Sequence, residues 1–162
     1  MSNYNIIDSN VIAIANGLHD TATIECMHNS ISFLKNIKEI VMRRDDVFLI
    51  YDTSFIILNE YFNHCRKGAE KKLGTAFLKW VHNHKNNQKK IILHDLPADI
   101  EFNEELLPEC YAGFDRNDRK YLILALDFKE FRPSLHYGID RGYLRYSQCF
   151  EDENIELSKL CL

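Results

Sequence analysis

The stretch YNIIDSN, residues 4–10, ends the first apolar run of the chain with an aspartate, Asp8. A short buried strand that ends in a carboxylate carries that charge to the rim of a sheet, where open α/β folds place their ligands. Four later apolar runs are also interpreted as strands, the last of them alternating as an edge strand does: VFLIY (47–51), KKIILHDL (89–96), SLHYGID (134–140) and IELSKLCL (155–162).

Helical patterns separate these strands, because apolar residues recur there every three or four positions. The first helix is expected to end at Gly17, and the long helix that follows is expected to have Asp20 or Thr21 as its cap. Thr53 or Ser54 is expected to cap the helix after the second strand. Strands that alternate with helices predict a three-layer α/β/α fold with a mainly parallel sheet of roughly five strands.

The rest of the fold prediction concerns residues 95–128. Two prolines and several acids make 95–113 a loop, with one turn of helix around Glu104 to Leu107. A helix then follows, capped by Asp115 or Asn117.

The composition is typical of a folded protein of single-domain length. The chain has 162 residues, of which 46% are hydrophobic and 27% charged, and this predicts one domain over residues 1–162. The longest apolar runs are far shorter than the roughly 20 residues of a membrane helix, and the start MSNYNIIDSN lacks the features of a secretory signal. We therefore expect a cytoplasmic protein with no membrane partner. Five scattered cysteines without a C-x-x-C pair predict reduced thiols, not disulfides or a zinc site.

Four acidic residues occupy positions that converge in such a fold. Asp8 closes the first strand, Glu60 lies in the helix after the second strand, Asp118 opens the helix after the long loop, and Asp140 closes the fourth strand. Carboxyl ends of parallel strands share one rim with the amino ends of the following helices. Because packed carboxylates repel, bound Mg²⁺ or Mn²⁺ explains such a cluster better than stability does, and these ions suit a phosphate substrate. Asp52, which also ends a strand, is an alternative to one of the four.

The motifs IIDSNVI, LIYDTSFIILNEYF, FDRNDRKYLILAL and GIDRGY occur in the order found in the PIN-domain nucleases, which the chain resembles over nearly its whole length. The most specific motif is NDRKYLILAL, in which an aspartate at the head of a helix is followed by an alanine seven residues later. The resemblance implies that Asp8, Glu60, Asp118 and Asp140 are the catalytic, metal-binding acids and that Asn10 orients Asp8. It implies metal-dependent hydrolysis of RNA, with 5′-phosphate and 3′-hydroxyl products.

Further residues are expected around this site. Asp115, three residues before Asp118, is a helix cap or an outer ligand, and a cap is favoured because a helix start needs one. The net charge of −4 does not indicate a nucleic-acid binder, but basic residues near the metals would hold a polyanion. Those expected to contact phosphates are Lys71, Lys72, Arg116 and Arg119.

Two positions depart from the family pattern and keep other functions open. Gly138 stands where the family often has Ser or Thr, and Gly142 where a second acid often follows. The main hypothesis is a ribonuclease that could also cleave single-stranded DNA. It would act as a toxin or defence effector and have an antitoxin or another protein as its partner. The alternative is a non-catalytic module that binds RNA or a protein. A phosphotransferase using Asp8 is disfavoured, because Asn10 stands where that chemistry needs a second acid.

A homodimer is a further hypothesis for the oligomeric state. The candidate contact surfaces are Trp80 and the aromatic region near Tyr143 and Tyr146.

Overall fold

The computed structural model describes residues 1–65 and 72–161. Within them, five strands form one fully parallel sheet in the order β3-β2-β1-β4-β5, which confirms the expected fold class and places β5 at an edge. The strands are β1 (Asn3–Ile7), β2 (Val47–Asp52), β3 (Ile91–His94), β4 (Ser134–Tyr137) and β5 (Glu156–Lys159).

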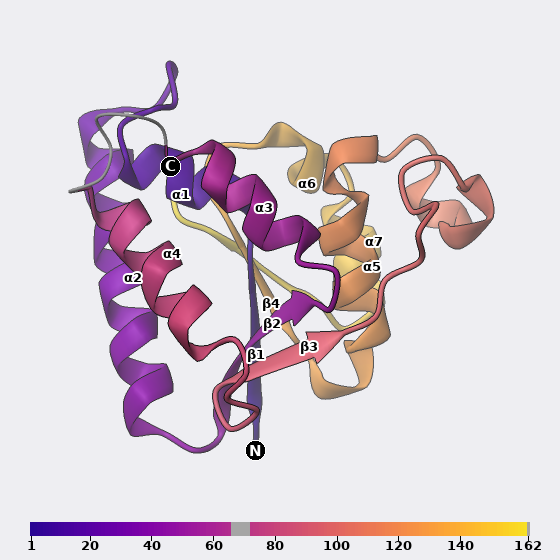
Figure 1. Cartoon of the computed structure of the whole chain (residues 1–162). Helices are drawn as coiled ribbons and strands as arrows, with labels where there is room; N and C mark the ends of the chain where they lie inside the picture. Colours follow the sequence, from indigo (N-terminus) through magenta and orange to yellow (C-terminus); the bar gives the residue numbers. More distant parts are fainter. Residues whose placement is uncertain (66–71, 162) are drawn as a thin grey trace.

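Helices cover both faces of this sheet (Figure 1). One face carries α1 (Ser9–Ala15), α2 (Ile24–Arg43), α3 (Ile56–Asn63) and α4 (Leu73–His84), which pack against one another. The other face carries α5 (Arg119–Asp127), which contacts the central strands, and α7 (Ser147–Asp152), which contacts β5. The expected helical turn in the long loop is present as a 3₁₀ turn at Glu104–Leu106. The sequence did not reveal α6 (Arg141–Arg145) and α7, because each is shorter than two turns and shows no helical period.

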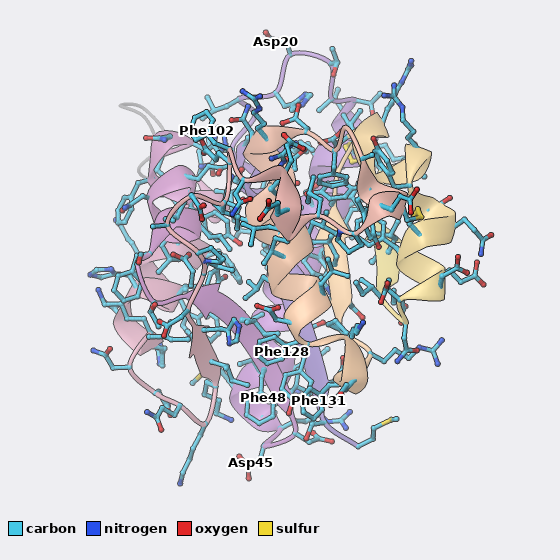
Figure 2. All side chains as sticks on the ribbon, turned by 90° about the vertical axis from the view of Figure 1, so that its right-hand side faces the viewer. Asp20, Asp45, Phe48, Phe102, Phe128 and Phe131 are labelled. Atoms are coloured by element: carbon cyan, nitrogen blue, oxygen red, sulfur yellow. A yellow bond between two sulfur atoms is a disulfide. The ribbon has the colours of Figure 1, made fainter. Side chains whose placement is uncertain are left out.

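The strand order reverses at the centre of the sheet. From β1 the chain adds β2 and then β3 on one side, and it returns across the sheet to place β4 on the other side of β1. Open α/β sheets bind ligands at such a switch point, outside the carboxyl ends of the strands. Figure 2 shows Asp45, which precedes β2, together with Phe128 and Phe131 at one end of the molecule, and Phe102 towards the other end.

Two helix caps differ from the prediction. Neither Asp20 nor Thr21 caps α2, because Thr23 does so by accepting a hydrogen bond from the Cys26 backbone N–H at 3.1 Å. Neither Thr53 nor Ser54 caps α3. A side chain from the end of β2 reaches the first turn of this helix and satisfies its free backbone donors. Gly17 does end α1, with φ at +72°.

The expectation of reduced thiols is wrong for four of the five cysteines. Cys26 is bonded to Cys161, and Cys110 to Cys149, with Cα–Cα distances of 4.8 and 6.0 Å. The pairs are 135 and 39 residues apart in sequence, so only the tertiary fold brings them together. Cys65 is the free cysteine within the described residues.

Two other expectations concern the surface. Trp80 and Tyr143 are buried in the core, so neither offers the exposed dimer contact that we expected. Nowhere in residues 1–65 and 72–161 does a helix combine the length and apolar character that crossing a bilayer requires.

Candidate metal centre

Three of the four acids singled out from the sequence meet at the switch point of the sheet. Asp8 directly follows β1, Asp140 follows β4, and Asp118 immediately precedes α5. Each offers a carboxylate oxygen, and these oxygens all lie within 4.8 Å of one another. A set of three hard oxygen donors suits Mg²⁺ or Mn²⁺ and fits the metal expected from the sequence.

Asp8 is held firmly by its neighbours. It is buried and caps α1, where one carboxylate oxygen accepts a hydrogen bond from the Asn10 backbone N–H at 2.8 Å. The other oxygen accepts a hydrogen bond from the Tyr143 hydroxyl at 2.6 Å. The contact of Asn10 with Asp8 is thus made by its backbone, and the orienting role expected of its side chain stays a prediction. The contribution of Tyr143 had no signal in the sequence, because 135 residues separate it from Asp8.

The two glycines singled out in the sequence, Gly138 and Gly142, lie near Asp140 in the chain, and Gly142 contacts it. Its carboxylate caps α6 by accepting a hydrogen bond from the Gly142 backbone N–H at 2.6 Å. A Cβ at residue 142 would lie 3.0 Å from that carboxylate, so glycine gives the acid room. At Gly138 a Cβ would lie 2.2 Å from the end of the Ile14 side chain. Ile14 thus fills the space that a Ser or Thr side chain would need.

The three acids do not all ionise readily in the metal-free protein. Burial raises the pKa of Asp8 to about 6, and the charges of Glu60 and Asp140 act in the same direction against the two hydrogen bonds. Burial also raises the pKa of Asp118 to about 9, with the Asp8 charge and a hydrogen bond to Asp140 adding to the effect. Near neutral pH the cluster therefore retains a proton, and a divalent cation would replace it.

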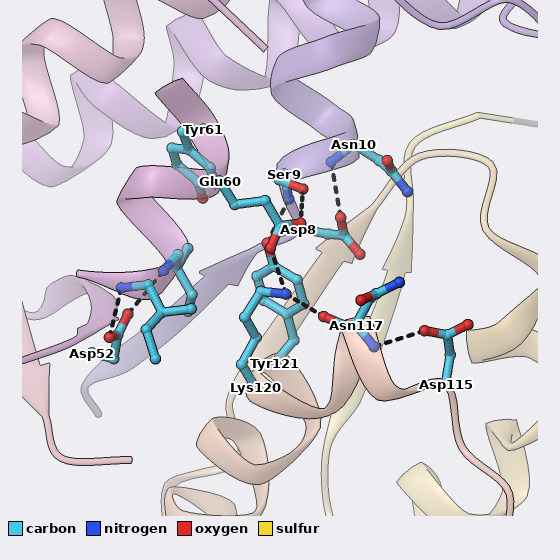
Figure 3. Close-up of polar contacts among 12 residues, drawn as sticks. Asp8, Ser9, Asn10, Asp52, Glu60, Tyr61, Asp115, Asn117, Lys120 and Tyr121 are labelled. Carbon is cyan, nitrogen blue, oxygen red and sulfur yellow. Dashed lines mark hydrogen bonds and ion pairs between the residues drawn. The ribbon is translucent and has the colours of Figure 1, made fainter. Parts of the chain in front are cut away.

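Glu60 lies beside this triad and not within it. Its carboxylate accepts a hydrogen bond from the Ser9 hydroxyl and forms an ion pair with the Lys120 ammonium, which also donates to the backbone oxygen of Asn117 (Figure 3). Its charge still reaches Asp8, whose pKa it raises. Sequence reasoning missed Ser9 and Lys120 as site residues, although each is near an assigned acid in the sequence.

Asp52 and Asp115 have structural contacts. Asp52 is buried at a place separate from Asp8, and it caps α3 (Figure 3). Its carboxylate accepts hydrogen bonds from the backbone N–H groups of Ile56 and Ile57 at 2.8 and 3.0 Å. It therefore does not replace any acid of the triad. Asp115 accepts a hydrogen bond from the Asn117 backbone N–H at 2.8 Å, which is the cap favoured from the sequence.

The four residues expected to contact phosphate differ in their position relative to the triad. The Arg119 side chain is buried, where it donates to the Glu101 backbone oxygen at 3.0 Å and pairs with Glu104 at 2.8 Å. This placement does not support a phosphate role for Arg119. Arg116 is exposed near the site. Lys72 is exposed before α4 and does not border the cleft at the triad, and Lys71 lies outside the described residues.

An open cleft of about 640 Å³ adjoins the triad. It lies between the start of α1, the exposed face of α3 and the turn before α5, and its polar lining includes Ser9, Asn10, Asn59, Glu60, Asp118 and Lys120. Amide groups and an ammonium group beside a cluster of carboxylates can bind a phosphorylated substrate whose phosphate also contacts a metal ion.

Comparison of the chain with protein-family profiles, with curated proteins and with solved structures gave no significant match. The geometry of the triad and the motifs of the sequence are therefore the basis for a functional proposal.

Proposed function

We propose that this protein is a divalent-metal-dependent ribonuclease of the PIN-like type, in which Asp8, Asp118 and Asp140 hold Mg²⁺ or Mn²⁺. One observation carries the proposal: three carboxylates converge within 4.8 Å at the switch point of a parallel sheet. Burial and neighbouring charges raise the pKa values of Asp8 and Asp118, so stability alone does not explain the cluster, whereas a bound cation does. The motif resemblance supports nucleic acid as the substrate and an effector role for the nuclease.

The residues of the site have separable roles in this reaction. The bound cation would supply Lewis-acid polarisation of the phosphate and activation of the attacking water. Hydrogen bonds from Asn10 and Tyr143 fix the Asp8 carboxylate before any ion binds, which reduces the cost of assembling the site. Gly142 does the same for Asp140.

Lys120 places a positive charge at the cleft, which it lines beside Asp118. Its side chain is only 6% exposed, and its ammonium is held by Glu60 and by the Asn117 backbone oxygen. Because Lys120 is as buried and as fully paired as Arg119, we assign to it the neutralisation of Glu60 and not a direct phosphate contact. That ion pair reduces the negative charge that a phosphate would meet beside the metal ligands.

The test compares the wild type with Asp118→Asn in Mn²⁺ titrations, measuring both the melting temperature and the cleavage of mixed RNA and single-stranded DNA. The wild type should gain about 2.7 kcal/mol of stability at 100 times the metal Kd and should cut RNA. The variant should show neither effect. The control is Asp45→Asn, because Asp45 is 96% exposed at the opposite end of the sheet and should leave both effects intact. Cleavage that persists in excess chelator would contradict the proposal.

A non-catalytic module that binds RNA or a protein is the second candidate. It is favoured by the ion pair between Glu60 and Lys120, which leaves three carboxylates at the centre where the sequence indicated four. A folded wild type whose melting temperature ignores Mn²⁺ and which leaves RNA intact would support this candidate over the nuclease.

A further inference from the structure

A small recess adjoins the acidic cleft on the side of the long loop. It has a volume of about 100 Å³ and combines apolar residues with a cation: Ile56, Ala98, Ile100, Phe102 and Arg116. It shares Ile56, Glu101, Asn117 and Lys120 with the lining of the cleft, so the two spaces are adjacent. A strand with a phosphate at the metal centre can therefore place a neighbouring nucleotide at this recess.

Phe102 is the most exposed aromatic side chain of the described residues, at 70%. The guanidinium carbon of Arg116 lies 5.5 Å from the centre of its ring. Among residues 1–65 and 72–161, Arg116 forms no ion pair, and its exposed guanidinium contacts the face of this ring. An exposed ring and an adjacent planar cation are groups on which nucleic-acid bases stack.

We propose that Phe102 and Arg116 form a stacking subsite for an unpaired base of a nucleic-acid strand whose phosphate lies at the metal centre. This inference rests on the proposed function and assigns its substrate class as single-stranded, because bases within a duplex are already stacked on their neighbours. The surroundings favour a nucleotide over an apolar peptide. Lys120 and Asn117 line both the recess and the cleft, so polar residues continue from the recess towards the metal centre.

The experiment measures binding on the otherwise wild-type chain with Ca²⁺ in place of Mn²⁺, and a gel checks that the probe stays intact, because Asp118→Asn would remove the metal at which the phosphate is proposed to lie. The probe is a fluorescently labelled single-stranded RNA of mixed sequence, and its anisotropy gives the Kd. Loss of the stacking surface in Phe102→Ala should weaken binding roughly 5- to 150-fold. Phe102→Trp should restore it, because a larger ring still stacks, and Arg116→Ala should weaken binding as well.

Two controls separate stacking from general damage. Phe131→Ala removes a ring that is 52% exposed at the opposite end of the molecule, and it should leave the Kd unchanged (Figure 2). A strand of the same length without bases should bind weakly and should not distinguish Phe102→Ala from its parent. Equal affinity of Phe102→Ala and its parent for the RNA would overturn the subsite, as would duplex RNA binding as tightly as the single strand.

The outcomes for the subsite and for the nuclease are distinguishable. A protein that binds single strands through Phe102 but cuts nothing in Mn²⁺ would support the subsite and contradict the proposed nuclease function. A protein that cuts RNA in Mn²⁺ but binds it independently of Phe102 would support the nuclease function and contradict the subsite.

Discussion

At the scale of single residues, Asp118 links stability to function most directly. Its pKa is raised to about 9 in the folded, metal-free protein, against 3.8 as the ordinary value. A carboxyl group with a raised folded-state pKa favours folding at low pH, and this contribution is lost as the pH rises from about 4 to about 9. Asp118→Asn removes that ionisation, because an amide resembles the protonated acid.

Without metal, we expect Asp118→Asn to melt at a higher temperature than the wild type at pH 8, by about 2–4 °C for each kcal/mol gained. The difference should shrink towards zero below about pH 3, where the acid is protonated in both the folded and the unfolded state. Saturating Mn²⁺ should reverse the order at pH 8. Thermal melts in chelator and in Mn²⁺ at both pH values check this, with Asp45→Asn as the matched control. A variant less stable than the wild type in chelator at pH 8 would contradict it.

Some residues of the site could be predicted from the sequence and others could not. Asp8, Asp118 and Asp140 were predictable, because each stands at a strand end or helix start and the topology alone brings those positions together. The roles of Tyr143 and Lys120 were not, since a hydrogen bond or an ion pair between distant segments depends on side-chain packing. The same packing buries the side chain of Arg119, which was expected to contact phosphate.

At the scale of elements, the close approach of α1 and α4 depends on Gly74. A Cβ at this residue would lie 2.7 Å from the Ile12 backbone oxygen and 2.6 Å from the Asn16 side-chain oxygen. That oxygen accepts a hydrogen bond from the Thr75 backbone N–H at 3.2 Å, so it is not free to move away. Neither obstacle is the far end of a flexible side chain. The helices must therefore separate to admit any larger residue.

Gly74→Ala should lower the free energy of unfolding by about 1–3 kcal/mol, although alanine on a helix is normally the more stable residue by up to about 1 kcal/mol. Urea titration followed by circular dichroism measures the change. Lys79→Ala, on the exposed side of the same helix, should stay within about 0.5 kcal/mol of the wild type. Equal or greater stability of Gly74→Ala would show that α1 and α4 separate at little cost.

Elements with a clear hydrophobic period were predictable from the sequence, and elements without one were not. The five strands and the long helix α2 follow apolar runs or spacings of three and four residues. In contrast, α6 and α7 have five and six residues, too few for a period to show. The predicted cap of α3 was also wrong, because the capping residue, Asp52, belongs to the preceding strand and is not next to the helix in the sequence.

At the scale of the whole molecule, two disulfides join segments that the sheet alone does not connect. Cys26, near the start of α2, is bonded to Cys161 after β5, and Cys110, in the long loop, to Cys149 on α7. They close loops of 135 and 39 residues. Closing such loops restricts the unfolded chain, which stabilises the folded state by about 2–4 kcal/mol for each bond.

We expect dithiothreitol to lower the melting temperature of the wild type by roughly 8–30 °C, because two bonds are lost. Cys26→Ala combined with Cys161→Ala should produce part of that loss without reductant, and Cys65→Ala, which breaks no bond, should not. Titration of thiols in the unfolded, unreduced protein should find one free thiol, and after reduction five. Five free thiols before reduction, with no effect of dithiothreitol, would contradict both bonds. Because the cytosol keeps thiols reduced, the stability of the reduced protein decides whether the fold suits the cytoplasmic location expected from the sequence.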